Sequence, residues 1–299
     1  MSKTIIKVAC KLWSNVTANI FFARMPYILD EFDFVESQAP DFYIFSNAKD
    51  KHAFKNCVRI YNPGENIPID MHICDWAIGE RYEEEINNPR YIRLPNYVRL
   101  GAGYNLVKND YQLDKLLSEK QKFCAFVYAN SGIQFRNDFF KRLSKYKHID
   151  SPGAALNNMP TIDRPGSREQ YYVSYDTKVN FLKKYKFTIA FANESSLGYT
   201  SEKIYHAMLA NSIPIYWGNP QVQRDFNTKS FINVHQYASL QQVVQEIIKL
   251  DKNDKLYLEY LKEPWYPQNV PTQYTDPTVI LNKFKKIFLG NENENCTCT

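Results

Sequence analysis

The stretch FTIAFANESSLGYTSEKIYHAMLANSIPIYW, residues 187–217, sets the fold class of this chain. It runs from one apolar segment, Phe187 to Phe191, to a second, Ile213 to Trp217, and a helical apolar pattern lies between them. The order strand, loop, helix, strand forms the unit that builds a parallel sheet. We therefore expect an α/β protein.

The loop before the expected helix indicates an anion site. Gly198 to Lys203 reads GYTSEK, which places Lys203 in the first helical turn. A cation at that position opposes the helix dipole unless an anion lies in front of it, and backbone N–H groups at a helix start favour such an anion. The loop therefore predicts a bound phosphate.

A second unit of the same kind precedes this one. Lys122 to Tyr128 (KFCAFVY) predicts a strand, and Arg136 falls in the first turn of the helix expected after it. Open sheets bind ligands at the carboxyl ends of their strands, so Arg136 and Lys203 suggest one shared anion. The alternative is a pair of solvated surface cations.

Composition limits the classes of protein that this chain can belong to. Its 299 residues, 44% of them hydrophobic and 23% charged, are enough for two α/β domains. The net charge of +5 fits an anionic ligand, but no basic stripe alternates with aromatic residues, so we expect no nucleic-acid binding. None of the six cysteines forms a CxxC pair; the four in or beside apolar stretches predict free thiols, and Cys296-Thr-Cys298 lies in the polar end expected to be disordered. No signal peptide and no segment of membrane-spanning length is evident, so the expected compartment is the cytoplasm.

The chain divides in the sequence into two domains and a tail. We predict one α/β domain over residues 1–115, a second over residues 116–290 and a disordered tail over residues 291–299. Residues 107–121 are expected to be a helical connection, and residues 151–170 a loop or lid. The strands predicted in the first domain are Thr4–Ala9, Asp41–Phe45, Cys57–Tyr61, Trp76–Ile78 and Tyr91–Leu94.

Two amphipathic helices are predicted near the end of the chain. Ser239 to Leu250 has apolar residues on one face, and Ser239 with Gln242 forms a capping box at its start. Leu281 to Leu289 is basic and amphipathic. This last segment is either a docked terminal helix or a helix that touches a membrane surface.

Several familiar catalytic motifs are missing from the sequence. It has no Walker loop, no GxGxxG after a strand, no HExxH, no GxSxG and no DxD, and its five histidines share no metal-binding spacing. A phosphate site without a metal must neutralise charge with side chains and backbone N–H groups. We therefore expect no metal and no other cofactor.

Phe191 to Val234 resembles the signature of the α-1,3/4-fucosyltransferases, glycosyltransferase family ten, and especially their bacterial branch. The family pattern is F-E-N, Y-x-T-E-K, an alanine in the helix, a proline between aliphatic residues, a glycine and a final S-F. Gly64-Glu65-Asn66 and Asp75 to Gly79 similarly resemble the family's acceptor domain. The residues that match the signature are Phe191, Asn193, Tyr199, Glu202, Lys203, Ala207, Pro214, Gly218, Ser230 and Phe231.

The resemblance implies the GT-B architecture, two Rossmann-like domains facing across a cleft. Residues 1–115 would bind the acceptor and residues 116–290 would bind GDP-fucose. Fucose would move with inversion to the 3-OH of GlcNAc in an oligosaccharide acceptor with a Gal-GlcNAc unit. The resemblance also implies Lewis-antigen chemistry on lipopolysaccharide or protein glycans. Peripheral contact at the inner face of a membrane is the alternative that the basic amphipathic segment 281–289 leaves open.

The resemblance also implies the residues that hold the donor. Arg136 and Lys203 are similar to the diphosphate ligands of the family, and Asn193 and Tyr199 match donor-contacting positions. Glu202 matches a catalytic carboxylate held close to the donor sugar and ribose.

Glu65 matches the general base proposed for the family. Inversion by single displacement needs a base on the acceptor side, and a carboxylate on a turn after a strand could supply it. The alternative for Glu65 is a solvated turn residue. The signature departs from F-E-N at Ala192, so either Glu194 replaces the missing carboxylate or that carboxylate has a structural role.

Two other functions remain open on the sequence. The chain could be a transferase of the same family with another donor or acceptor, including α-1,4 regiochemistry or a sugar other than fucose. It could also be a catalytically weak protein that binds a nucleotide sugar.

Overall fold

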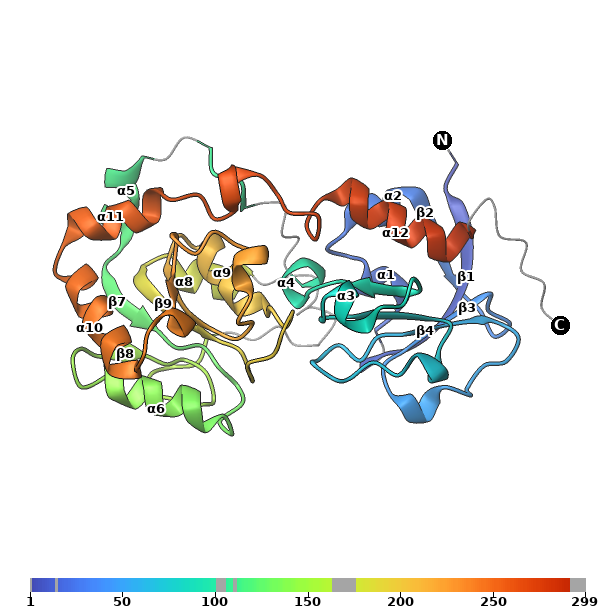
Figure 1. The fold of residues 1–299 in the computed structure, drawn as a ribbon, viewed down its shortest axis with the longest axis horizontal. Helices are drawn as coiled ribbons and strands as arrows, with labels where there is room; N and C mark the ends of the chain where they lie inside the picture. The colour runs from blue at the N-terminus through green and yellow to red at the C-terminus, as the bar shows by residue number, and fades with distance from the viewer. Residues whose placement is uncertain (1, 14–15, 101–105, 110–111, 163–175, 291–299) are drawn as a thin grey trace. The chain divides into compact units, whose positions relative to one another are not determined.

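The computed structural model of the chain describes residues 2–290, except residues 14–15, 101–105, 110–111 and 163–175. The described residues form two compact units (Figure 1). Unit 1 contains the described residues up to 100 and those from 273 onward, and unit 2 contains the rest.

Unit 1 is built on a parallel six-stranded sheet with the order β2-β1-β3-β4-β5-β6. The order reverses between β1 and β3, where Val8 pairs with Phe42. Its described strands and helices are β1 (Thr4–Lys11), α1 (Ala18–Phe21), α2 (Pro26–Glu31), β2 (Phe32–Glu36), β3 (Phe42–Phe45), β4 (Val58–Tyr61), β5 (Trp76–Gly79), α3 (Glu83–Ile86), β6 (Tyr91–Arg93), α4 (Asn96–Arg99) and α12 (Pro277–Leu289).

The strands predicted for the first half of the chain are confirmed, and β2 is additional. This edge strand has only five residues, and just Phe32 and Phe34 are buried in it. Its apolar signal is therefore too short to be separated from the helix α2 that directly precedes it.

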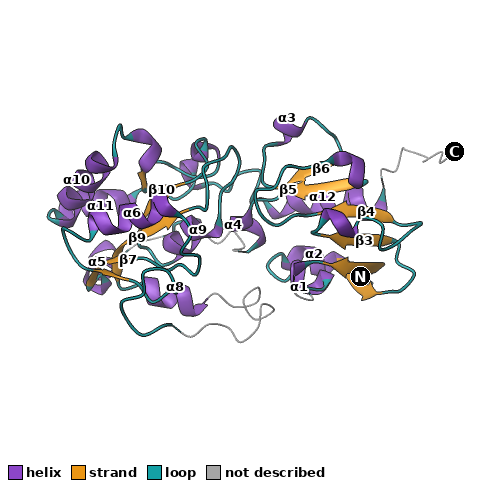
Figure 2. Cartoon of the chain, turned by 90° about the horizontal axis from the view of Figure 1, so that it is seen from below, coloured by secondary structure: helices purple, strands orange, loops and turns teal. Residues whose placement is uncertain are grey.

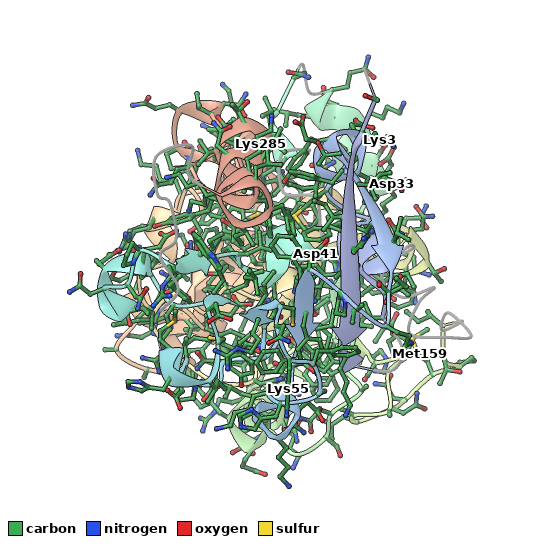
Figure 3. The ribbon with its side chains drawn as sticks, turned by 90° about the vertical axis from the view of Figure 1, so that its right-hand side faces the viewer. Lys3, Asp33, Asp41, Lys55, Met159 and Lys285 are labelled. Carbon is green, nitrogen blue, oxygen red and sulfur yellow. The ribbon has the colours of Figure 1, made fainter. Side chains whose placement is uncertain are left out.

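The structure places α12 in unit 1, whereas the sequence-based division assigns it to the second domain. Its Phe284 and Phe288 are buried, with ring centroids 5.0 and 6.2 Å from that of Phe22. Lys285 of α12, labelled in Figure 3, forms an ion pair with Glu31 of α2 at 2.8 Å. The apolar face of this helix is thus packed inside unit 1, as the docked-helix interpretation predicts.

Unit 2 contains a parallel five-stranded sheet with the order β11-β10-β9-β7-β8. Figure 2 labels its strands β7, β9 and β10. The strands β7, β9 and β10 confirm the predicted apolar runs, whereas the two-residue strands β8 and β11 carry no run long enough to predict. Its described elements are α5 (Leu113–Glu119), β7 (Lys122–Ala125), α6 (Gln134–Leu143), β8 (Ile149–Asp150), α8 (Asp176–Leu182), β9 (Tyr185–Phe191), α9 (Glu202–Leu209), β10 (Ile213–Trp217), β11 (Ile232–Asn233), α10 (Leu240–Asp251) and α11 (Asp254–Lys262).

The helices of unit 2 are fixed by caps and by aromatic packing. The predicted cap of α10 is confirmed, because Ser239 Oγ accepts a hydrogen bond from the Gln242 N–H. Phe187 of β9 packs against Tyr257 of α11, and α9 packs on β9 and β10. These contacts hold the loops at the carboxyl ends of β7 and β9 on a rigid base.

The predictions for the cysteines, the tail and the lid can be compared with the described residues. The cysteines at positions 10, 57, 74 and 124 are free thiols, as predicted. The tail 291–299 and most of the second half of the predicted lid lie outside the described residues. Among the described residues, none of the helices combines the length and the apolar character needed to cross a membrane.

Candidate functional site

The loops that follow β7 and β9 meet where the strand order of unit 2 reverses. Arg136, in the first turn of α6, joins them, because its Nη1 donates to Asn193 Oδ1 at 3.3 Å and its Nη2 donates to the Asn130 carbonyl at 2.7 Å. The guanidinium carbon lies 3.8 Å from the centre of the Tyr128 ring. Parallel open sheets bind ligands at this kind of switch point.

Arg136 is completely buried, with 0% of its surface exposed. The interpretation of Arg136 as a solvated surface cation is therefore wrong. Glu202 is close enough to interact electrostatically with the guanidinium. A buried charge is costly unless it is compensated, and here the two Nη groups are hydrogen-bonded and Glu202 supplies opposite charge, while Nε has no hydrogen-bond partner among the described residues.

The GYTSEK loop is held by a buried hydrogen-bond network. Thr200 Oγ1 donates to Asp225 Oδ2 at 2.6 Å, and Asn219 Nδ2 donates to Thr200 Oγ1 at 3.0 Å. The Gly198 N–H donates to Asn219 Oδ1 at 3.0 Å, and Gly198 has the positive φ of +78° that glycine adopts readily. The network fixes the backbone at the start of α9. Asn219 and Asp225 come from the segment after β10, so the pattern of the loop itself did not indicate them.

Glu202 and Lys203 form an ion pair at the start of α9. Lys203 Nζ lies 3.2 Å from Glu202 Oε1, and the two side chains are 16% and 11% exposed. Burial alone would raise the pKa of Glu202, but Lys203, Lys178 and His206 outweigh burial and lower it to about 2. Glu202 is therefore a carboxylate at neutral pH.

Lys178 adds a third cation that the sequence analysis missed. It belongs to α8, which packs on α9, and it interacts with Glu202, Lys203 and Arg136. Burial and the two neighbouring cations lower its pKa to about 8, while Glu202 opposes the shift. Its partners lie far away in the sequence, so no local pattern marks it. We call Arg136, Lys178 and Lys203 the cation cluster.

Tyr199, Ala192 and Glu194 are the other residues of unit 2 that the sequence singles out. Tyr199 is 2% exposed and interacts electrostatically with Arg136. Ala192 is fully buried, and its N–H donates to the Trp217 carbonyl at 2.7 Å. Glu194 is exposed, so it does not place a carboxylate at the buried position of Ala192.

Glu65 lies in unit 1, on the turn that follows β4. It is exposed, and its carbonyl accepts a hydrogen bond from the Ile67 N–H at 2.8 Å. The preceding Gly64 has a φ of +73°. The geometry leaves both the general base and the solvated turn residue open for Glu65.

No group of three or more histidine, cysteine, aspartate or glutamate side chains that could hold a metal ion occurs among the described residues. The cation cluster instead offers positive charge from side chains, beside the N–H groups at the start of α9. Such an arrangement can bind an anion of the phosphate class.

Comparison with family models decides the family. Residues 117–284 match the model for glycosyltransferase family 10 (fucosyltransferase), C-terminal part, and residues 11–100 match the model for the N-terminal domain of α-(1,3)-fucosyltransferase FucT. The chain belongs to glycosyltransferase family 10. The matched segment of this family 10 member covers the whole candidate site of unit 2.

Curated relatives and solved structures agree with the family. An α-(1,3)-fucosyltransferase FucT of Helicobacter pylori is 31% identical over 242 residues, which are 71% of this chain and 48% of the relative. An α-(1,3)-fucosyltransferase B of Drosophila melanogaster is 33% identical over 184 residues, which are 57% of this chain and 40% of the relative. The family 10 chain thus spans less than half the length of these relatives.

The fold of this family 10 chain is also that of solved relatives. The crystal structure of an α1,3-fucosyltransferase with GDP-fucose has a TM-score of 0.74 and 25% identity, over 98% of this chain and 93% of that one. The same comparison with a GDP complex gives a TM-score of 0.77. The prediction of an α/β protein of the GT-B class, with two Rossmann-like units, is confirmed.

Proposed function

We propose that this chain is an inverting α-1,3-fucosyltransferase that moves fucose from GDP-fucose to the 3-OH of GlcNAc in a Gal-GlcNAc acceptor. The carrying observation is the cation cluster around Glu202 at the switch point of unit 2, in a chain of family 10. Relatives that are described as α-1,3-fucosyltransferases support the same activity.

The cation cluster would stabilise the leaving group. Negative charge builds on the β-phosphate as GDP departs, and preorganised cations and N–H groups at that point lower the barrier. Lys203, Lys178 and the first N–H groups of α9 would supply this stabilisation, and the interaction of both lysines with Glu202 at the start of α9 supports the proposal. Arg136 is buried, so it would act by its charge and by fixing Asn193, with which it shares a hydrogen bond.

Two carboxylates would act in the transfer, Glu202 at the donor sugar and Glu65 at the acceptor hydroxyl. Glu202 remains ionised because its pKa is lowered to about 2, and a carboxylate beside the donor sugar favours an oxocarbenium-like transition state. Glu65 would accept the proton of the acceptor hydroxyl, since it is exposed and next to a turn glycine. No metal is required in this proposal, so turnover is expected to continue with EDTA present.

The test is a transfer assay on the wild-type chain and two variants. Glu65→Gln is expected to lower kcat by about 100-fold or more, because general-base catalysis contributes on that order. Its affinity for GDP should stay within about twofold, since the donor-side residues are unchanged. Asp33→Asn is the control, because Asp33 is an exposed carboxylate on β2 and is assigned no role.

Two results would overturn the proposal. One is a wild-type chain that releases no GDP with any Gal-GlcNAc acceptor, and the other is a Glu65→Gln variant with full turnover. GDP binding without turnover would support a protein that only binds the nucleotide sugar.

A second candidate is a family 10 transferase with another donor or acceptor. The observation that favours it is Ala192, which is buried where the family signature has glutamate. A panel of GDP-fucose, GDP-mannose and UDP-sugars decides between the two, because a preference for a sugar other than fucose would promote this candidate.

A further inference from the structure

The turn that carries Glu65 is bound by side chains of α4, a helix that follows it in the sequence of unit 1. The carbonyl of Gly64 accepts hydrogen bonds from Asn96 Nδ2 at 3.2 Å and from Arg99 Nη2 at 3.4 Å. Both donors belong to α4, and each residue is 4% exposed. Arg99 Nη2 also donates to Asn96 Oδ1, so the two side chains are oriented relative to each other.

Trp13 closes the other side of the same turn. A Cβ atom built on Gly64 would lie 1.7 Å from Trp13 Cζ2, so the indole ring fills the space beside this glycine. The guanidinium of Arg99 lies 5.0 Å from the centre of the Trp13 ring. The backbone of the turn is therefore enclosed by Trp13, Asn96 and Arg99.

Glu80 holds α4, the helix whose Asn96 and Arg99 side chains donate hydrogen bonds to the Gly64 carbonyl. It follows β5 directly, is 5% exposed and accepts a hydrogen bond from the Asn96 N–H, and it interacts electrostatically with Arg99. The loops after β4, β5 and β6 are thereby connected at the carboxyl edge of the sheet. Glu65 also interacts with Glu80, which shows that the base candidate lies near this connection.

We propose that Arg99, together with Asn96, is a positioning residue for Glu65. The inference rests on the function proposed above. A catalytic group must be held within about 0.5 Å of its productive position, and Glu65 is an exposed side chain on a turn. The backbone of the turn sets the position from which this side chain extends, and the carbonyl of the adjacent Gly64 is the group of the turn that α4 binds.

Arg99→Lys is the decisive variant, because lysine keeps the charge beside Glu80 but loses the guanidinium fork. Loss of alignment is expected to lower kcat by about 10- to 100-fold, while KM for GDP-fucose stays within about twofold. If Arg99→Lys folds poorly, Asn96→Ala, which removes the other donor without adding volume, should likewise lower kcat with little change in KM.

Arg59→Lys is the matched control. Arg59 lies at the opposite end of β4 from the turn, and its guanidinium forms two hydrogen bonds with Asp75, both at 3.0 Å. The control loses an arginine contact in the same unit but away from the turn. Because the Arg59 side chain is 29% exposed and Arg99 is 4% exposed, the melting temperature of each variant is measured beside kcat to separate lost stability from lost alignment. The kcat of Arg59→Lys should stay within about threefold of the wild-type value.

Hydrogen exchange of the peptide 62–67 supplies a readout that needs no turnover. Arg99→Lys should raise exchange of this peptide, and Arg59→Lys should not. Unchanged exchange together with wild-type kcat in Arg99→Lys would overturn the inference, as would an equal loss of kcat in Arg59→Lys. A wild-type chain without fucosyl transfer would refute the proposed function, and the exchange data would still decide whether Arg99 holds the turn.

Discussion

Lys178 illustrates, at the level of one residue, how burial prepares a cation for an anionic ligand. Its pKa is lowered to about 8 by burial, with Lys203 and Arg136 adding to the shift. A diphosphate bound beside it would favour the protonated form and raise the pKa again. Binding should therefore take up a proton near pH 8.

The affinity for GDP is expected to fall as the pH rises from 7.5 to 9, by up to about tenfold per pH unit above the pKa of Lys178. The sign follows because the protonated lysine binds the anion and is lost above its pKa. Lys178→Met should bind GDP more weakly and show a flatter profile. Calorimetry across this pH range measures both effects.

Lys141→Met is the control for that experiment, because Lys141 is an exposed residue of α6. It should keep the affinity and the pH dependence of the wild-type chain. A Lys178→Met profile as steep as that of the wild type would contradict the assignment.

The turn after β4 shows, at the level of an element, how little space surrounds the base candidate. Gly64→Ala combines a φ of +73° with a Cβ that would meet Trp13 Cζ2 at 1.7 Å. Strain of this kind costs roughly 1–3 kcal/mol, so the melting temperature and kcat should both fall. Thermal unfolding and the transfer assay measure the two losses.

Gly132→Ala is the control variant for the loss of stability expected in Gly64→Ala. Its new Cβ would meet only the flexible side chain of Asn130, at 3.2 Å, and Gly132 has no positive φ. A loss of stability as large in Gly132→Ala as in Gly64→Ala would show that the steric argument is wrong.

Long apolar runs made most elements of the sheets predictable. β7, β9 and β10 have runs of apolar residues and follow the expected order, because a buried parallel strand needs such a run on both faces. β8 and β11 have two residues each, and their pairing depends on the neighbouring strand. A cap such as that of Ser239 was equally predictable, since it acts within three residues.

At the level of the whole molecule, α12 connects the end of the chain to its beginning. Its Phe288 packs against Phe32, Phe34 and Phe42, with centroid distances of 5.1 to 5.3 Å. Phe288→Ala is expected to lower the free energy of unfolding by about 3–5 kcal/mol, because it removes a buried aromatic ring from a filled core. Urea unfolding followed by tryptophan fluorescence measures the change.

Leu289→Ala provides the contrast, because Leu289 is 54% exposed at the end of the same helix. Its effect should stay below about 0.5 kcal/mol. Equal losses in the two variants would contradict the assignment of this stability to the buried aromatic face of α12, because alanine has the higher helix propensity in both cases.

The sequence by itself determined the α/β class, the two strand–loop–helix units, and Arg136 and Lys203 as candidate anion ligands. Its resemblance to the family added Asn193, Tyr199 and Glu202. These features depend on neighbours a few residues apart, through periodicity, caps and a motif in one loop. Only the tertiary structure decided that Arg136 is buried and that Lys178 joins the cation cluster. It also decided that α4 holds the Gly64 carbonyl and that α12 belongs to unit 1. Each of these contacts joins residues that are far apart along the chain, so it exists only once the sheet has brought the loops together and leaves no local pattern to read.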